Sequence, residues 1–272
     1  DLCVGCGVCT VGTSSSMQWN KYGFLEPAKI DEVERNYKYC PFNLYPDKEV
    51  KTEDELGDLF LAEAPKSHPE IGRYYNTYVG YSKEFRETSS SGGLATYILN
   101  ELLEKKEVDY VVSVGEDKSK NGFYTYKIVG TKEELLETSK TKYYPVSMSD
   151  ALKQVENLNG TCAIVGTACF VKAIRLLQYY QPEFRDKIKF IVGIICGGQK
   201  SKYYADFLAS HLNLGPKEYK KPQYRIKDFN SYASDYSFGC LDSNGDKYTL
   251  KMKGLGDMWC TGLFKNNACD FC

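Results

Sequence analysis

The sequence predicts an α/β chain in which a small cysteine-rich segment precedes a larger domain built on a mixed β-sheet. Two observations lead to this prediction. Four of the eleven cysteines lie within the first 40 residues, and short apolar runs alternate with amphipathic stretches from residue 77 onward. Strand–helix alternation of this kind is typical of α/β domains with at least partly parallel sheets. A chain of 272 residues is long enough for both parts.

The first three cysteines, Cys3, Cys6 and Cys9, follow a Cys-x-x-Cys-x-x-Cys pattern, and Cys40 stands before a proline. Three thiolates at this spacing can bind three irons of a 4Fe–4S cluster, and a distant Cys-Pro can bind the fourth. We therefore predict one 4Fe–4S cluster at these four residues. A structural zinc site is the main alternative, because zinc also accepts four thiolates. A disulfide framework is a weaker alternative.

The residues around this motif suit a compact ligand loop. Gly5 and Gly7 fit the tight curvature between the cysteines. Residues 17–24 resemble a hairpin and residues 31–39 a short charged helix, and together they would bring Cys40 back to the other three ligands.

Residues 46–75 are rich in Pro, Asp, Glu and Lys and predict a linker between a ferredoxin-like segment at 1–45 and a domain at 76–272. Short apolar runs predict strands, and longer amphipathic stretches predict helices. The expected strands are residues 77–81, 109–114, 124–129, 162–165 and 190–195. The expected helices are residues 94–105, 132–138, 150–158, 170–180 and 201–212. Short polar strands are expected at residues 223–227 and 247–253.

Charge and composition narrow the function classes. The net charge is −1, so the chain lacks the basic field that drives nucleic-acid binding. No apolar run approaches the roughly 20 residues of a membrane span, and the chain starts with a ligand motif rather than a signal peptide. The odd number of cysteines favours reduced metal ligands, so we expect a cytoplasmic protein. Because it starts at Asp1 and stops at Cys272 within a Cys-x-x-Cys pair, we expect a fragment.

A serine- and glycine-rich turn at residues 88–93 precedes the helix expected at 94–105. Serines can cap a helix, and small residues allow an anion to approach its free N–H groups. An ordinary serine-capped helix start is the alternative. The turn matches neither a Walker A loop nor a Gly-x-Gly-x-x-Gly fingerprint.

Two further cysteines follow the most apolar predicted strands, Cys169 after 162–165 and Cys196 after 190–195. The carboxyl ends of strands in α/β sheets are where sites tend to lie. With Cys269 and Cys272 these thiolates would make a second set of four ligands, for a second 4Fe–4S cluster. The alternatives are that Cys169 and Cys196 are buried core thiols beside a disordered tail, or that Cys260 replaces one ligand.

Taken in order, these motifs resemble the family of coenzyme F420 hydrogenase/dehydrogenase beta subunits, which includes plant 7-hydroxymethyl chlorophyll a reductase. The order is the N-terminal cysteines, then residues 89–93, 139–143 (Ser-Lys-Thr-Lys-Tyr), 166–169 (Gly-Thr-Ala-Cys) and 195–198 (Ile-Cys-Gly-Gly), then the terminal cysteine pair. The resemblance spans nearly the whole chain, and the ordered set is more specific than any one motif.

This resemblance implies an iron–sulfur flavoprotein oxidoreductase that holds FAD and one or two 4Fe–4S clusters. It implies electron transfer to a small-molecule two-electron acceptor, which is the deazaflavin coenzyme F420 in hydrogenase relatives, and a redox partner protein or ferredoxin. The second cluster would relay electrons between the flavin and the first cluster. The implied flavin-binding residues are Ser89, Ser90, Ser91, Gly92, Gly93, Lys140, Lys142, Tyr143, Gly166 and Thr167. For the two lysines and the tyrosine, a solvated loop is the alternative.

The chain also departs from the family pattern. Relatives commonly have Pro-Cys-Gln where this chain has Ala168, Cys169 and Phe170, and His-Gly where it has Gly197 and Gly198. The second change puts proton delivery by that histidine in doubt. His68 and His211 are expected at the surface, which gives little support to a hydrolytic site.

Three other functions remain open from the sequence. The protein could reduce a different organic substrate, act as an electron-relay subunit of a larger redox complex, or be a zinc-stabilised binding module. A visible spectrum showing flavin and iron would exclude the last of these. Turnover without a partner would distinguish an enzyme from a relay.

Overall fold

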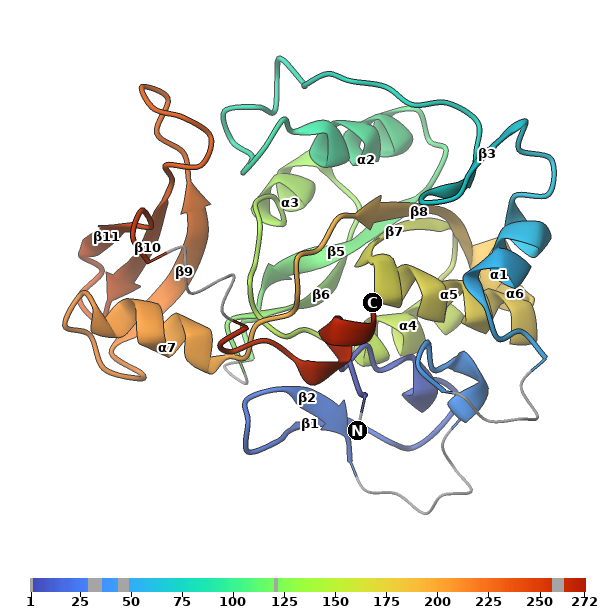
Figure 1. Cartoon of the computed structure of the whole chain (residues 1–272), viewed down its shortest axis with the longest axis horizontal. Coiled ribbons are helices and arrows are strands. Elements are labelled where there is room, and N and C mark those ends of the chain that lie inside the picture. The colour runs from blue at the N-terminus through green and yellow to red at the C-terminus, as the bar shows by residue number, and fades with distance from the viewer. Residues whose placement is uncertain (1, 29–35, 44–48, 120–121, 256–261) are drawn as a thin grey trace.

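A four-stranded mixed sheet forms the centre of the molecule, in the order β6-β5-β7-β8 (Figure 1). The computed structural model describes residues 2–28, 36–43, 49–119, 122–255 and 262–272. Strand β5 (Tyr110–Glu116) pairs antiparallel with β6 (Tyr124–Val129), and β7 (Cys162–Thr167) and β8 (Ile188–Ile194) run parallel to β5. The α/β class and the mixed sheet predicted from the sequence are confirmed.

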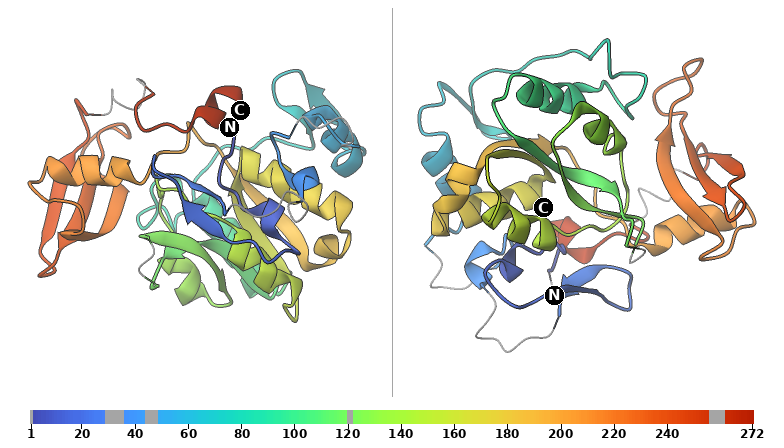
Figure 2. Two further views of the ribbon diagram at one scale, coloured as in Figure 1. Left: turned by 90° about the horizontal axis from the view of Figure 1, so that it is seen from below. Right: turned by 180° about the vertical axis from the view of Figure 1, so that it is seen from behind.

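Helices cover both faces of this sheet (Figures 1 and 2). Helices α2 (Leu94–Glu104) and α3 (Lys132–Glu137) lie on one face, where Leu99 and Leu135 share a core with Val111 and Ala163. The opposite face packs against α4 (Ser149–Glu156), α5 (Ala168–Tyr180) and α6 (Glu183–Lys187), and the adjacent strand residues Val112 and Ile164 point there. This alternation follows from the two-residue period of a strand.

A second, three-stranded antiparallel sheet stands to one side of the main body (Figure 1). It consists of β9 (Tyr219–Ile226), β10 (Ser237–Asp242) and β11 (Lys247–Lys251), and α7 (Tyr203–Ser210) packs on it through Tyr204 and Leu208. The sequence predicts α7, β9 and β11 but not β10. It did not predict that these strands form a sheet of their own.

The N-terminal segment packs on the helical face formed by α4 and α5. It contains the predicted hairpin, β1 (Met17–Trp19) with β2 (Leu25–Pro27), and the short 3-10 helices η1 (Val8–Thr10) and η3 (Tyr37–Tyr39). Val8 and Val11 belong to the same buried core as Leu152 and Ile174. Most of the helix predicted at 31–39 lies outside the described residues, and η3 covers its end.

The predicted linker contains regular structure. Helix α1 (Glu53–Phe60) starts with a capping box formed by Thr52 and Glu55, and β3 (Lys66–His68) pairs with β4 (Gly72–Tyr74). Leu56 of α1 packs against Leu176 of α5. Such a helix needs only one narrow apolar face for packing, so its composition stays mostly polar and resembles that of a linker. The division into domains stays a prediction.

Residues 77–81 form no strand in the structure, contrary to the sequence prediction. Tyr78 is 86% exposed and Val79 106% exposed, and no neighbouring strand in the described chain pairs with this segment. An apolar, β-branched stretch makes a strand only where a partner accepts its backbone hydrogen bonds. No described helix is both long and apolar enough to cross a lipid bilayer.

Candidate functional site

The four N-terminal cysteines come together in the structure. Burial raises the pKa of the Cys6 thiol well above its usual value, and negative charge on Cys9, Cys40 and Cys3 raises it further. The Asn36 N–H donates to the Cys9 carbonyl at 3.2 Å, which holds the segment before Cys40 against the loop of the other three cysteines. Four thiolates so placed repel one another, and bound iron would offset that repulsion with its positive charge.

Backbone groups surround these sulfurs. The Gly5 N–H donates to Cys3 Sγ at 3.4 Å, and the Val8 N–H lowers the pKa of Cys6 in opposition to burial. The loop is tied to the start of α4, because the Met148 N–H donates to the Cys6 carbonyl at 2.8 Å. Hydrogen bonds to cysteine sulfur are among the factors that set the potential of an iron–sulfur cluster.

The curvature predicted for the glycines is confirmed. Gly7 has a φ of 78°, and a Cβ at this position would lie 2.1 Å from Ser147 Oγ. Gly5 has a φ of 69°, and its Cβ would lie 2.7 Å from the Leu25 carbonyl oxygen. Both positions therefore require glycine for two reasons, the left-handed backbone and the space available.

Replacing Gly7 with alanine is expected to lower the free energy of unfolding by about 1–3 kcal/mol, since the left-handed backbone and the overlap with Ser147 both oppose a side chain. Thermal unfolding of anaerobic protein measures the loss. Gly245→Ala is the matched control, because Gly245 has a φ of 95° but no atom within 4 Å of the place that a Cβ would take. Equal losses in the two variants would mean that the overlap at Gly7 contributes nothing.

Cys169 and Cys196 lie at neighbouring strand ends, as predicted. Parallel pairing places Thr167 of β7 beside Ile194 of β8, so the segments that follow start together. Burial raises the pKa of Cys169 to about 11, and Cys272, Cys196 and Cys269 contribute to the increase. The paired strand ends and these charge effects agree in making the four predicted ligands of the second cluster neighbours in the fold.

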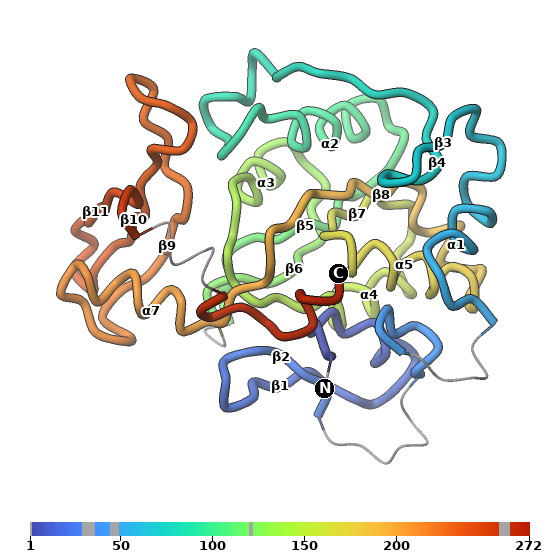
Figure 3. Tube along the Cα trace, viewed as in Figure 1, coloured from blue at the N-terminus to red at the C-terminus, as the bar shows by residue number. Residues whose placement is uncertain are grey.

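The C-terminal tail folds back toward the N-terminal segment, so that the two ends of the chain lie near each other (Figures 1 and 3). Asn266 Nδ2 donates to the Cys3 carbonyl at 3.0 Å, and the Gln199 N–H donates to Cys269 Sγ at 3.3 Å. Helix η4 (Asn267–Phe271) contains Ala268, which is fully buried. The described tail is thus packed, contrary to the alternative of a disordered tail. Cys260 lies outside the described residues.

Tyr126 of β6 is a buried aromatic side chain influenced by a cysteine of each thiol group. Its hydroxyl donates to the Val165 carbonyl at 2.9 Å, and its ring stacks on Phe170 with centroids 6.3 Å apart. Burial raises the pKa of Tyr126, and charges on Cys169 and Cys6 raise it further. One buried aromatic side chain is therefore close to a cysteine of each group.

The spacing of the thiols bears on the zinc alternative. Within the described ranges, no three His, Cys, Asp or Glu side chains are arranged to bind a single metal ion. Four ligands of one zinc would have sulfurs only about 3.8 Å apart, given a Zn–S distance near 2.3 Å in a tetrahedron. The thiolates of a 4Fe–4S cluster each bind a different iron and so lie further apart. The described residues thus present no preformed zinc site, and the iron, sulfide and zinc content of the protein decides between the two.

The serine turn differs from the prediction in its cap. Gly93, with a φ of 78°, is the N-cap of α2 and makes no side-chain capping bond, so the serines do not cap this helix. Ser90 Oγ instead accepts a hydrogen bond from the Thr141 N–H at 2.9 Å. Ser89 Oγ is buried and has no partner in the part of the chain that the structure describes. The first N–H groups of α2 are therefore not occupied by a capping side chain.

The 139–143 segment packs against this turn, but its lysines have other partners. Lys142 Nζ donates to the carbonyls of Thr138 and Ser139 at the end of α3, and Lys140 Nζ donates to Gln223 Oε1 at 3.3 Å. Burial, with Lys140 next in importance, lowers the pKa of Lys142 to about 7. These contacts stabilise the carbonyl end of α3 and connect the segment to β9.

The two lysines also line a cavity of about 220 Å³ between the main body and the small sheet. Lys221, Glu116 and Gln223 contribute to its walls. Its lining is mixed in charge, and it does not include the serine turn.

Tyr143 connects the surroundings of the serine turn to the second thiol group. Its ring contacts Tyr224 with centroids 5.7 Å apart. Burial raises the pKa of Tyr143, Arg225 opposes this increase, and Cys196 adds to it. Gly166 and Thr167 lie instead beside the thiols, where Thr167 Oγ1 is 3.5 Å from Cys169 Sγ.

The structure adds basic residues near the serine turn that no pattern in the sequence indicates. Lys227 Nζ donates to the Ser91 carbonyl at 2.6 Å and to the Arg86 carbonyl. Arg225 forms a hydrogen bond with Tyr143. No local pattern in the sequence relates Arg225 or Lys227 to the serine turn, since they come from the small sheet.

Comparison with known proteins gives consistent matches. The family described as coenzyme F420 hydrogenase/dehydrogenase, beta subunit, matches with its N-terminal part over residues 77–153 and its C-terminal part over residues 160–272. A coenzyme F420-dependent sulfite reductase from Methanocaldococcus jannaschii is 25% identical over 287 residues, covering 89% of this chain and 42% of that protein. One subunit of the F(420)H(2) dehydrogenase of Methanosarcina mazei is 27% identical over 119 residues, covering 44% of this chain and 33% of that protein.

The chain thus spans less than half the length of these curated relatives. Among solved structures, the F420-reducing [NiFe] hydrogenase complex from Methanosarcina barkeri contains a similar fold, with a TM-score of 0.53 and 22% identity. That match covers 76% of this chain and 68% of the other. Since the two family matches together take in most of the chain and agree with the order of its motifs, the protein belongs to the oxidoreductase family of coenzyme F420 hydrogenase/dehydrogenase beta subunits.

Proposed function

We propose that this protein is an iron–sulfur flavoprotein that transfers electrons between two 4Fe–4S clusters and a two-electron acceptor by way of FAD. The observation that supports the proposal is that the loop carrying Cys3 and the segment after β8 both contact the folded-back tail that carries Cys269, next to the paired ends of β7 and β8. Separate groups linked by buried packing suit stepwise electron transfer. The ligands would be Cys3, Cys6, Cys9 and Cys40 for the first cluster, and Cys169, Cys196, Cys269 and Cys272 for the second.

The protein's own groups would hold and tune these clusters. Backbone N–H groups of Gly198 and Gln199 donate to Cys196 and Cys269 at 3.4 and 3.3 Å. Such bonds favour the anionic sulfur, as do those at the first group. The first group is the more buried of the two, since Cys6 is buried whereas Cys196 and Cys272 are exposed. Burial and exposure are expected to give the two clusters different potentials.

The surroundings of the serine turn fit an anionic cofactor such as FAD. The uncapped start of α2 offers backbone N–H groups, and Ser89 offers a buried hydroxyl without a partner among the described residues. Bound FAD would exchange a hydride with an organic molecule and single electrons with the clusters. Tyr143 would lie between this site and Cys196, on the route to the second cluster.

The proposed electron acceptor and the proposed protein partner are suggested by the relatives named above. Those named above use coenzyme F420 or F420H2, or reduce F420, so we propose a deazaflavin of this kind as the two-electron acceptor or donor. Because the solved relative is a complex and the M. mazei relative is a subunit, a redox partner protein or ferredoxin is part of the proposal. A relay subunit without its own substrate chemistry, or a reductase of another organic substrate, remains the alternative.

The proposal is tested by anaerobic purification and reconstitution of the chain, followed by flavin, iron and acid-labile sulfide counting. Reduced deazaflavin, reduced nicotinamide nucleotides and reduced ferredoxin are then compared as reductants of the bound flavin. Flavin together with two clusters per chain is the expected result. Bound zinc without acid-labile sulfide would contradict the proposal.

Replacing Gly92 with valine is expected to weaken FAD binding by roughly ten- to a hundredfold, because branched methyl groups would obstruct the approach of phosphate to the α2 N–H groups. The chain should still fold, because a Cβ at Gly92 has its nearest neighbours, the Gly80 carbonyl oxygen and Tyr81 Cβ, at 3.4 Å. Quenching of flavin fluorescence measures the affinity. Gly92→Ala serves as the graded control and should lose less, whereas unchanged binding by the valine variant would exclude a phosphate site at this turn.

A further inference from the structure

Lys227 joins the small sheet to the serine turn. It follows β9 directly, and its ammonium donates to the backbone carbonyls of Ser91 and Arg86. A positive charge from a strand far away in sequence therefore lies against residues 89–93. This contact places the end of β9 beside the uncapped start of α2.

Arg225 lies two residues earlier, in β9, and one N–H donor of its guanidinium group has no acceptor in the described chain. Its Nε is buried and has no partner among the described residues, while the group bonds Tyr143 and lies over the Tyr236 ring at 5.1 Å. A buried donor without an acceptor is unfavourable unless a ligand or water completes it. This second donor lies near the end of β9, two residues before Lys227.

The cationic side chains near the serine turn affect the pKa of Lys227. Burial lowers the pKa of Lys227, and Arg86 and Arg225 lower it further, while Glu87 has the opposite effect. Three cationic side chains thus act on one another beside the turn, with Glu87 as the acidic group that opposes them. An anionic ligand would relieve this repulsion.

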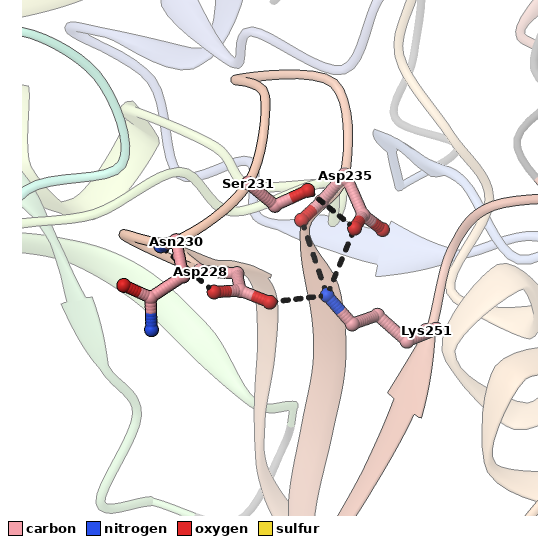
Figure 4. Close-up of polar contacts among 5 residues, drawn as sticks. All are labelled: Asp228, Asn230, Ser231, Asp235 and Lys251. Carbon is pink, nitrogen blue, oxygen red and sulfur yellow. Dashed lines mark hydrogen bonds and ion pairs between the residues drawn. The ribbon is translucent and has the colours of Figure 1, made fainter.

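The acidic residue next to Lys227 is held by other groups (Figure 4). Lys251 Nζ binds Asp228 Oδ2 at 2.8 Å and Asp235 Oδ2 at 3.2 Å, and the Asn230 N–H donates to Asp228 Oδ1 at 3.1 Å. Ser231 Oγ donates to Asp235 Oδ2 at 2.7 Å. This network pairs Asp228 and Asp235 with one lysine and fastens the loop after β9 to β11.

We propose that Arg225 and Lys227 form a cationic clamp for the diphosphate of a dinucleotide held at residues 89–93. The clamp rests on the proposed FAD site and extends it to residues of the small sheet. Guanidinium and ammonium groups bind phosphate oxygens through charge-assisted hydrogen bonds, and the α2 N–H groups and Ser89 would contribute from the other side. The site would then select FAD over riboflavin, which has no phosphate.

The test compares FAD and riboflavin binding to the flavin-free, anaerobically prepared chain by fluorescence quenching. Arg225→Gln and Lys227→Met are each expected to weaken FAD binding roughly ten- to a hundredfold and to change riboflavin binding by less than about twofold. Lys220→Met is the matched control, because Lys220 is an exposed lysine of the same strand whose ammonium binds the Ser243 carbonyl. It should bind FAD as the wild type does.

The outcomes separate the clamp from the proposed function. Wild-type FAD binding with unchanged affinity in both clamp variants would overturn the clamp alone. Parallel losses of FAD and riboflavin would overturn it too, since they would indicate a structural role. A wild-type chain that binds no flavin would overturn both proposals. Arg225→Lys guards against misfolding: it keeps the charge and should retain part of the FAD preference, with an unchanged circular dichroism spectrum.

Discussion

Replacing Cys6 with serine is expected to remove about half of the iron and acid-labile sulfide, because a cluster that loses one of its four thiolates becomes labile. Cys6 is the most informative position in the first group. It is buried, and charges on the other three cysteines of that group act on it. Iron and sulfide counting on anaerobic protein, with electron paramagnetic resonance of the reduced sample, measures the loss.

Cys162→Ala is the control for this experiment. Cys162 is also fully buried, but it lies in β7 within the main core, and burial alone, slightly opposed by Lys187, accounts for its raised pKa. The control variant should keep its full iron content. If the Cys6 variant also keeps all its iron, the first ligand set is wrong.

Replacing Cys196 with serine is expected to remove the other half of the iron and to interrupt electron flow from the flavin to the remaining cluster. The side chain is exposed, so serine at this position should leave the fold intact. The Gly198 N–H donates to its sulfur at 3.4 Å, and its charge raises the pKa of Tyr143. Stopped-flow reduction by a deazaflavin should show flavin reduced while the N-terminal cluster stays oxidised.

The control for this second position is Cys240→Ala. Cys240 is buried in the small sheet, and its pKa is raised by burial and Asp242 rather than by other cysteines. That variant should transfer electrons as the wild type does. Full iron content in the Cys196 variant, together with loss in a Cys260→Ser variant, would instead make Cys260 a ligand of the second cluster.

Local patterns predicted the elements of the main domain well. The strand predicted at 124–129 coincides with β6, and the helix predicted at 94–105 differs from α2 by one residue. Each of these elements carries the apolar period that its own backbone geometry requires. Two predictions were wrong because they depended on neighbours that a local pattern does not show. Residues 77–81 have no strand partner within the described chain, and Gly93 rather than a serine caps α2.

The sequence by itself determined the two cysteine motifs, the glycines that curve the first of them, the α/β class and the family, because each depends on residue type and spacing along the chain. Tertiary structure decided which distant groups meet. The pairing of β7 with β8 and the folded-back tail bring Cys169, Cys196 and Cys269 together, and the end of β9 leads Lys227 to the serine turn. These contacts join residues that share no local period, so only the packing of apolar surfaces and the hydrogen bonds of buried backbone could create them.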